Sequence, residues 1–449
     1  MIRPFRTSVL IAAALATAGC GVFKGSKPKT PVLGQRQPIL VAETGAEVDP
    51  GLAAIDVLLP PVAVNDAWTQ PGGNPAHAMG HLGLSATPAR AWEARVAGGD
   101  ARARLAAAPV VANGRIYVVD TQADLHAFDA QTGAKVWTVS VTDPNSPDGG
   151  RGAKRNQAAL FGGGVSVEGD RLFATDGLGD VVALNVSDGS VIWRKRPGGP
   201  LRGAPALSNG NAYVVSQDNQ VFALRQSDGN IEWTQSGTLE VSGVFGVAAP
   251  AAAQGTVVAG FSSGELNAYR YENGRAIWQD ALSRTSISTT VGTISDIDAD
   301  PVIDGGRVFA IGSGGRMVAL ELITGQRVWE INAGGISTPW AAGEWLFVVT
   351  DEARLLCIAR SNGRVRWATQ LPRWQSVKRK SGAITWTGPV LAGNRLIAAS
   401  SNGQIVYVSP ASGAVEATVR YGRPVSLPPI VANSTLYLLD DQGTLTAWR

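Results

Sequence analysis

The chain has 449 residues, of which 54 are glycine and 13 are tryptophan, 45% are hydrophobic and only 17% are charged. This composition excludes an intrinsically disordered chain and favours strands and tight turns over long helices. The formal net charge of +3, from 39 basic and 36 acidic residues, gives no support to a nucleic-acid partner.

The first twenty residues begin with positive charge and continue into a short apolar stretch. Arg3 and Arg6 precede the apolar residues 8–16, which are too few to span a bilayer, and small residues then lead to Cys20. This order resembles a bacterial lipoprotein signal over residues 1–19. The resemblance implies that Cys20 becomes the mature N-terminus and carries the lipid. An ordinary secretory signal with an incidental cysteine remains the alternative.

Residues 20–60 contain several lysines and prolines and no sustained hydrophobic period. Such a composition is typical of a linker, so we predict a lipid-anchored, flexible tether here. Gly21 follows Cys20, and the absence of Asp at that position resembles the sorting of lipoproteins to the outer membrane.

From Asp124 onward one pattern recurs: a short apolar alternation, a polar turn, a glycine, and a tryptophan four residues after the glycine. Alternating residues suit a strand, and a glycine after Thr, Asp or Asn suits a hairpin turn. The pairs are Gly133–Trp137, Gly189–Trp193, Gly229–Trp233, Gly274–Trp278, Gly325–Trp329 and Gly363–Trp367, and the last copy has Gly413 with Ala417 in place of the tryptophan.

Further strands precede each hairpin, for example at 115–119 and 171–175, and a proline with an apolar pair lies upstream of most of them. Four strands in a period of roughly 40 to 55 residues are typical of propeller blades. The chain stops at 443–449, which is the third strand of an eighth copy, while 91–95 has the pattern of a fourth strand without preceding ones. We therefore predict an all-β, eight-bladed β-propeller over 89–449, closed by pairing of its N- and C-terminal strands.

This layout resembles the pyrroloquinoline-quinone-type propeller repeat, in which the recurring tryptophan wedges between neighbouring blades. Quinone-dependent dehydrogenases share this fold and resemble one another in having adjacent cysteines, a calcium site and a catalytic aspartate. Here the cysteines are Cys20 and Cys357 alone, and we interpret Asp176, Asp218 and Asp351 as turn residues. We expect no catalytic residue, no cofactor and no metal.

Two local features have simpler interpretations than a ligand site. His77 and His81 lie four residues apart, but Ala78 stands where a zinc protease needs glutamate, so we expect the segment 61–88 to pack on the propeller. The cluster Arg373, Lys378, Arg379 and Lys380 is interpreted as a solvated loop between blades, with contact to anionic lipid or nucleic acid left open.

The run Ser-Asp-Ile-Asp-Ala-Asp-Pro at 295–301 resembles a segment of the BamB family of outer-membrane assembly lipoproteins. The family pattern has Ser-Asp-x-Asp before the proline that opens a blade, so its two aspartates fall on Asp296 and Asp298. A companion loop of the family reads apolar-Arg-Gly before Ala-Pro, and we match it to Val244 and Phe245, with Phe245 where arginine is usual. The resemblance implies that these four residues bind the barrel-forming subunit BamA.

The resemblance implies a non-catalytic scaffold at the outer membrane, lipid-anchored and facing the periplasm. The expected partners are BamA periplasmic domains, other barrel-assembly subunits and unfolded outer-membrane proteins, with the membrane reached through the N-terminal lipid and no nucleic acid. A periplasmic quinoprotein-like dehydrogenase and another envelope-binding propeller are the alternatives.

Overall fold

The computed structural model describes residues 46–100, 103–143, 160–239, 247–282, 296–313 and 315–449. The chain divides into two units, Met1–Glu43 and Thr44–Arg449. The first unit lies outside the described residues, so the structure below is that of the second. Cys20, Val244 and Phe245 also lie outside the described residues.

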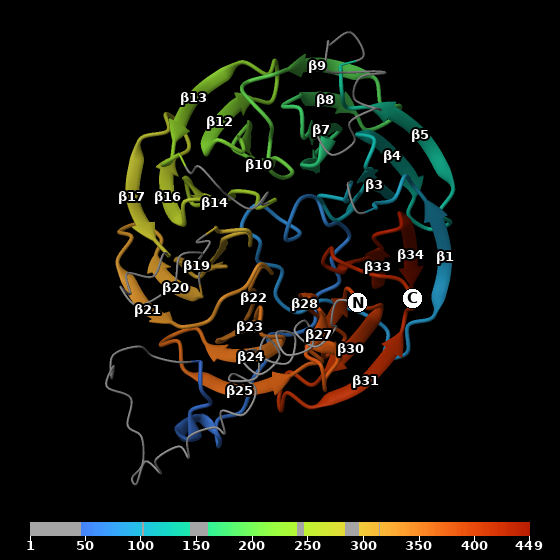
Figure 1. Ribbon diagram of the computed structural model, residues 1–449. Helices are drawn as coiled ribbons and strands as arrows, with labels where there is room; N and C mark the ends of the chain where they lie inside the picture. Colours follow the sequence, from blue (N-terminus) through green and yellow to red (C-terminus); the bar gives the residue numbers. More distant parts are fainter. Residues whose placement is uncertain (1–45, 101–102, 144–159, 240–246, 283–295, 314) are drawn as a thin grey trace, which may run out of the picture. The chain divides into compact units, whose positions relative to one another are not determined.

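The described residues form eight four-stranded antiparallel sheets, which follow one another around a ring (Figure 1). The first four blades are β2 (Val110–Ala112), β3 (Arg115–Val119), β4 (Asp124–Asp129) and β5 (Lys135–Ser140); β6 (Gly163–Glu168), β7 (Arg171–Asp176), β8 (Val181–Asn185) and β9 (Val191–Lys195); β10 (Ala206–Ser208), β11 (Asn211–Val215), β12 (Gln220–Arg225) and β13 (Ile231–Ser236); and β14 (Ala251–Ala253), β15 (Thr256–Gly260), β16 (Glu265–Arg270) and β17 (Ala276–Ala281).

The other four blades are β18 (Val302–Asp304), β19 (Arg307–Gly312), β20 (Arg316–Glu321) and β21 (Arg327–Ile331); β22 (Trp340–Ala342), β23 (Trp345–Val349), β24 (Arg354–Ala359) and β25 (Val365–Gln370); β28 (Trp386–Ala392), β29 (Arg395–Ser400), β30 (Gln404–Val408) and β31 (Val415–Arg420); and β32 (Ile430–Ala432), β33 (Thr435–Leu439), β34 (Thr444–Trp448) and β1 (Arg90–Arg95). A two-stranded hairpin, β26 (Trp374–Ser376) and β27 (Ser381–Ala383), and a 3-10 turn, η1 (Pro50–Leu52), complete the described elements. No helix among them is long and apolar enough to span a membrane.

The sequence prediction of an all-β, eight-bladed propeller is confirmed. The last blade contains β32, β33 and β34 from the C-terminus and β1 from the start of the propeller, so the predicted closure by terminal strands is also confirmed. The register pairs Trp92 with Ala447 and Arg95 with Thr444. Because the ring is closed in this way, the edge of β34 is covered by β1 rather than left open.

Burial within a blade follows its position between two neighbours. In β4 residues 125–128 are all buried, whereas no residue of the outermost strand β5 is fully buried. The middle strands are covered on both faces by adjacent blades, and apolar residues therefore fill them continuously instead of alternating. This explains why the sequence copies contain runs such as Val-Val-Ala-Leu in β8.

The recurring tryptophan joins each blade to the next. Each indole lies against the turn glycine of the following blade, and its Nε1 donates a hydrogen bond to a carbonyl just before that turn. The described pairs are Trp92 to Ala130, Trp137 to Val186, Trp193 to Gln226, Trp233 to Tyr271, Trp278 to Leu322, Trp329 to Arg360 and Trp367 to Pro410, with N···O distances of 2.7–3.4 Å. The glycine is required because an added Cβ would collide with the ring, at 2.6 Å from Trp233 in the case of Gly274.

This packing can be tested with a matched pair of glycine substitutions. Gly274 and Gly210 both have left-handed backbone, with φ of +69° and +76°, but a Cβ on Gly210 would meet nothing within 4 Å. Gly210→Ala should therefore lose about 1 kcal/mol of unfolding free energy from backbone strain alone. Gly274→Ala should lose a further ~1–3 kcal/mol because it displaces the Trp233 indole. Equal melting temperatures for the two variants, measured by calorimetry, would contradict this account.

The structure explains why the last copy has Ala417 in place of the tryptophan. Ala417 lies on β31, which faces the last blade, and in that blade the third and fourth strands, β34 and β1, are the two ends of the propeller. No hairpin turn joins them, so there is no turn glycine for an indole to cover. The ring of Tyr421 instead packs on Trp448, with centroids 6.5 Å apart.

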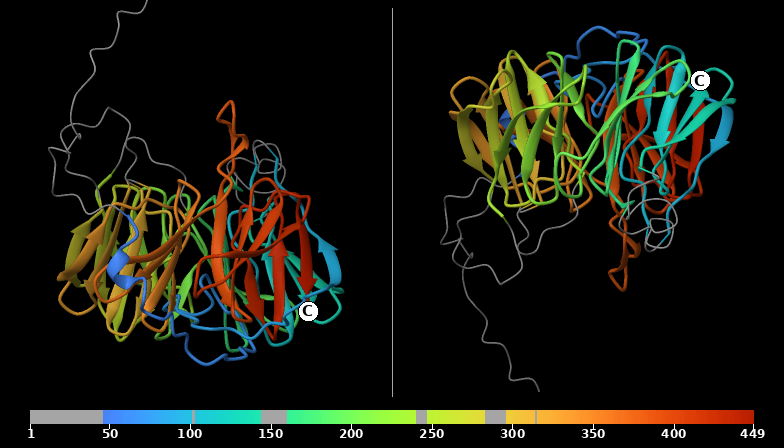
Figure 2. Two further views of the ribbon diagram at one scale, coloured as in Figure 1. Left: turned by 90° about the horizontal axis from the view of Figure 1, so that it is seen from below. Right: turned by 90° about the horizontal axis from the view of Figure 1, so that it is seen from above.

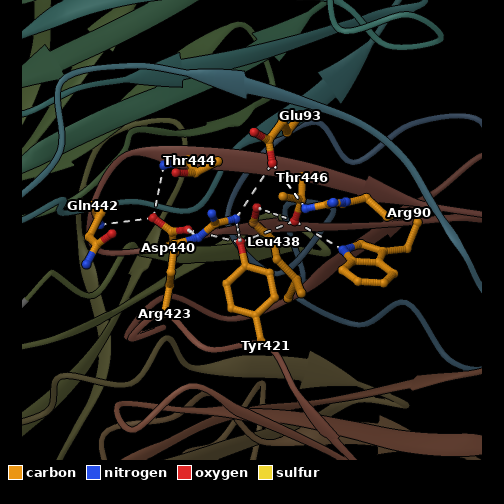
Figure 3. Close-up of polar contacts among 10 residues, drawn as sticks. Arg90, Glu93, Tyr421, Arg423, Leu438, Asp440, Gln442, Thr444 and Thr446 are labelled. Carbon is orange, nitrogen blue, oxygen red and sulfur yellow. Dashed lines mark hydrogen bonds and ion pairs between the residues drawn. The ribbon is translucent and has the colours of Figure 1, made fainter.

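A polar cluster holds this closing interface (Figure 3). The Asp440 carboxylate is fully buried, pairs with Arg423 at 2.5 Å and accepts a hydrogen bond from the Tyr421 hydroxyl at 3.0 Å. Its other oxygen accepts the backbone N–H groups of Gln442 and Thr444, at 3.0 and 2.9 Å. One carboxylate thus fixes both the turn before β34 and the side chains that arrive from β31.

Replacing Asp440 should weaken the closure more than replacing an exposed partner of the same arginine. Asp440→Asn leaves Arg423 without its buried counter-charge and should cost at least about 2 kcal/mol of unfolding free energy. Glu93 lies 3.9 Å from Arg423 and is 39% exposed, so Glu93→Gln should cost less than about 1 kcal/mol. Denaturant titration of both variants measures the difference, and an Asp440→Asn protein as stable as the Glu93→Gln control would refute the role of this carboxylate.

Candidate functional site

A segment before the propeller makes a circuit of its inner rim. Residues 63–83, here called the rim segment, contact the innermost strand of every blade in turn and cross the centre of the ring (Figure 1). The contacts run Asn65 with Val431, Trp68 with Val111, Thr69 with Val167, Gln70 with Leu207, Pro75 with Ala252, Ala76 with Ile303, Gly80 with Trp340 and Leu82 with Leu391. The circuit closes on itself, because Gly83 donates to Ala63 and Ala63 donates to His81.

The two histidines of the rim segment are buried and serve this circuit. His77 Nδ1 lies 2.7 Å from the Pro301 carbonyl oxygen, and His81 Nδ1 lies 2.9 Å from that of Pro60. His81 Nε2 accepts the backbone N–H of Asn394 at 3.1 Å. The described residues contain no group of three or more His, Cys, Asp or Glu side chains arranged to hold a metal ion. These contacts give both histidines a packing role.

A cavity of about 620 Å³ lies in the channel of the ring. Trp68 of the rim segment lines it and stacks on Trp340 of β22, with centroids 6.1 Å apart and planes 19° from parallel. Trp386 and Ile336 add apolar wall, while Asp298 belongs to its charged lining. The channel is therefore a mostly apolar hollow with carboxylates among its lining residues.

Arg202 binds both aspartates that the sequence singled out. Its Nη2 lies 2.8 Å from Asp296 Oδ1 and 3.3 Å from Asp298 Oδ1, and the three residues are called the Arg202 cluster below. The Arg202 and Asp296 side chains are 1% and 0% exposed, and that of Asp298 is 10% exposed. Such a buried pair is stable only while both partners are present, because a lone buried charge is costly.

The backbone around the cluster ties distant blades together. Arg202 precedes β10, and its own N–H donates to Val215 while its carbonyl accepts from Gly163. Asp296 precedes β18, and its carbonyl accepts both the N–H and the hydroxyl of Ser313, at 2.9 and 2.8 Å. The cluster thus spans the connections that enter the third and the fifth blade, across the intervening one.

Burial raises the pKa of Asp298 to about 7, with a further increase from the neighbouring Asp296 carboxylate. Burial also raises the pKa of Asp351. The Asp298 carboxyl therefore changes between its protonated and ionised forms near neutral pH, and the charge of the cluster lining the channel depends on pH.

The titration of Asp298 should be visible in stability. The folded protein keeps this proton up to about pH 7, whereas an unfolded chain releases it near pH 4, so the carboxyl makes folding less favourable as pH rises through that window. Asp298→Asn removes this loss, and its melting temperature relative to the unsubstituted protein should rise between about pH 5 and pH 8. Asp188 is exposed and its pKa is lowered by the backbone of Ser190, so Asp188→Asn should show no such trend in this range. A constant difference for Asp298→Asn across that range would argue against the raised pKa.

The structure modifies the expected roles of the predicted site residues. Asp298 keeps a small exposed fraction and lines the channel cavity, but Asp296 presents no exposed surface to a partner, so its contribution would be to hold Arg202 and the segment before β18. Asp176 accepts the N–H groups of Leu178 and Asp180, at 3.0 and 2.9 Å, as expected for a turn residue.

Sequence reasoning missed Arg202, although a signal was present. The run Leu-Arg-Gly-Ala-Pro at 201–205 has the apolar-Arg-Gly pattern before Ala-Pro, with arginine in place, and it lies one blade before the run assigned around Phe245. The observed contacts of Arg202 with Asp296 and Asp298 favour 201–205 as the companion loop.

A family model described as outer membrane protein assembly factor BamB matches residues 82–152 and 140–369. The chain belongs to the BamB family. The matched residues include the whole Arg202 cluster and most of the rim segment's partners, and they end before the β26–β27 hairpin.

Curated BamB proteins are similar over most of their length. That of Yersinia pestis is 25% identical over 363 residues, which are 81% of this chain and 89% of the relative. That of Escherichia coli K12 is 28% identical over 360 residues, 80% of this chain and 88% of the relative.

Solved structures show the same fold. BamB from Moraxella catarrhalis has a TM-score of 0.64 at 15% identity and covers 81% of this chain and 98% of its own. The quinohemoprotein alcohol dehydrogenase of Comamonas testosteroni also has a TM-score of 0.64, at 13% identity, and covers 86% of this chain and 81% of its own. Fold likeness therefore does not separate BamB from the dehydrogenases, whereas the family model does.

Proposed function

We propose that this chain is a non-catalytic scaffold of the machinery that assembles β-barrel proteins in the outer membrane. The observation that carries the proposal is its membership of the BamB family over a region that includes the Arg202 cluster. A rigid closed ring suits this role, because it holds loops from separate blades in fixed relation to one another.

The proposed direct partner is BamA, bound through its periplasmic domains near the Arg202 cluster. Asp298 would offer a partly exposed carboxylate, while Asp296 and Arg202 would keep the surrounding connections in place. Val244 and Phe245 remain proposed contacts, with Phe245 as an apolar anchor of the kind that dominates protein interfaces. Other barrel-assembly subunits and unfolded outer-membrane proteins are the further proposed partners.

The proposed location is the periplasmic side of the outer membrane. The signal-like residues 1–19 and Cys20 support lipid attachment. Of the predicted tether 20–60, residues 46–60 contact the sixth blade, where Arg364 pairs with Asp49 and Arg366 donates to the Ile55 carbonyl, so the preceding residues would link the lipid to the folded part. Because an acyl chain gives membrane affinity by burying methylenes, the role needs no membrane-spanning helix.

The runner-up is a quinoprotein-like dehydrogenase, favoured by the shared fold alone. Those enzymes resemble one another in carrying a pair of adjacent cysteines. This sequence has no such pair, because Cys357 is buried on β24 and Cys20 stands in the signal region. Dye reduction after addition of quinone and calcium would favour the enzyme. A propeller that binds another envelope component would instead fail to recover any barrel-assembly subunit.

A pull-down from detergent-solubilised envelopes tests the scaffold role. The tagged, full-length lipoprotein should recover BamA and other barrel-assembly subunits, identified by mass spectrometry. A folded, membrane-bound protein that recovers none of them would refute the proposed function.

A second comparison in the same experiment tests the contact residues separately. The variant with Val244→Asp and Phe245→Asp should recover at least about tenfold less BamA, because charge replaces the proposed apolar anchor. Ile323 lies in the turn between β20 and β21 and is 75% exposed, so Ile323→Asp is a control that should recover normal amounts. Normal recovery by the double variant would remove these two residues from the site while leaving the scaffold role intact.

A further inference from the structure

A basic hairpin projects from the face of the ring opposite to the rim segment (Figure 2). It consists of β26, β27 and the intervening residues 377–380, and it lies in the connection from β25 to β28. Its base is fixed, since Ile384 N donates to the Arg373 carbonyl at 2.9 Å and Trp386 Nε1 donates to that of Pro372 at 2.8 Å. The tip is thus held out by a buried base and adds nothing to the packing of a blade.

The hairpin concentrates positive charge. Arg373, Lys378, Arg379 and Lys380 are all exposed, and no acidic residue occurs between Leu371 and Trp386. Among the described residues, no carboxylate lies within ion-pair distance of any of these four cations. Other arginines of the ring, such as Arg327 and Arg360, do have carboxylate partners. Among the described residues, the four charges are therefore not used in ion pairs.

Apolar side chains accompany the charges at the tip. Val377 is 78% exposed, the highest value for a large hydrophobic side chain in the described part of the chain. Trp374 is half-buried, and the Arg373 guanidinium lies 5.5 Å from its ring centroid. Cations beside an exposed aliphatic and an aromatic side chain form the combination that suits the interface of an anionic bilayer.

We propose that the tip of the basic hairpin docks on a surface of anionic phospholipid. Lys378, Arg379 and Lys380 would meet the headgroup phosphates, while Val377 would enter the headgroup layer. A stable protein interface buries roughly 800 Å² per partner over a broad surface, whereas a projecting tip can contact a planar charged surface without such an area. This inference goes beyond the proposed scaffold role. If Cys20 carries lipid, the hairpin supplies a second, reversible membrane contact.

Vesicle sedimentation tests the proposal with the mature chain carrying Cys20→Ser, which cannot be acylated. We expect binding to vesicles of phosphatidylethanolamine and phosphatidylglycerol, weakening with added salt, and little binding to phosphatidylcholine alone. Replacing Lys378, Arg379 and Lys380 together by Gln should weaken binding roughly a hundredfold, because each cation near an anionic surface contributes about a factor of five.

The matched control removes equal charge elsewhere. Lys195, Arg275 and Arg420 are exposed on outer strands and turns, and replacing all three by Gln should leave vesicle binding within about twofold. Unchanged binding by the hairpin variant, equal loss in the control, or no binding of the unsubstituted protein to anionic vesicles would each overturn the proposal. Loss of an acidic protein partner from the hairpin variant, with vesicle binding retained, would also overturn it. BamA recovery by the hairpin variant should stay normal, so failure here is distinct from failure of the scaffold role.

Discussion

The contact between each outer-strand tryptophan and the turn glycine of the next blade is the interaction on which the ring depends. A single blade cannot cover its own middle strands, so its stability comes from the two neighbours that bury them. The indole fixes the spacing of those neighbours by packing on a turn that has no Cβ, and its hydrogen bond to the preceding carbonyl fixes the angle. Where the chain ends replace that turn, Ala417 replaces the tryptophan, and a polar cluster around Asp440 takes over the interface.

The closed ring leaves its connections free to differ. The hairpins that carry the glycines must keep their geometry, because each is packed against an indole, whereas the segments that lead from one blade into the next have no such requirement. The Arg202 cluster and the basic hairpin both lie in such segments. The rim segment, by contrast, is tied to the inner strand of every blade, so it can add to the rigidity of the ring without contributing to those surfaces.

The fold could be predicted from the sequence because its determinants are local and repeated. Each glycine and its tryptophan lie four residues apart, so every copy shows the same signal, and the split blade is visible as a third strand without a fourth. The site was harder to predict, because Arg202 contacts Asp296 and Asp298, which lie 94 and 96 residues away in the sequence. No local pattern reveals contacts between residues so far apart in the chain. The family pattern was matched to Val244 and Phe245, while Leu-Arg-Gly-Ala-Pro at 201–205 has the same pattern one blade earlier. The circuit of the rim segment was equally hidden, since each of its residues has a different, distant partner.

The positions of the two proposed surfaces have a consequence for orientation. The Arg202 cluster lies in the segments that precede the third and fifth blades. The basic hairpin lies in the segment that precedes β28 of the seventh blade. Two contacts on different connections of one rigid ring together remove rotational freedom. A scaffold held to BamA at one point and to anionic lipid at another would be confined to one orientation, which a flexible tether at Cys20 alone could not impose. Lipid binding at the hairpin would then restrict the orientation of the scaffold more than it would raise its affinity for BamA.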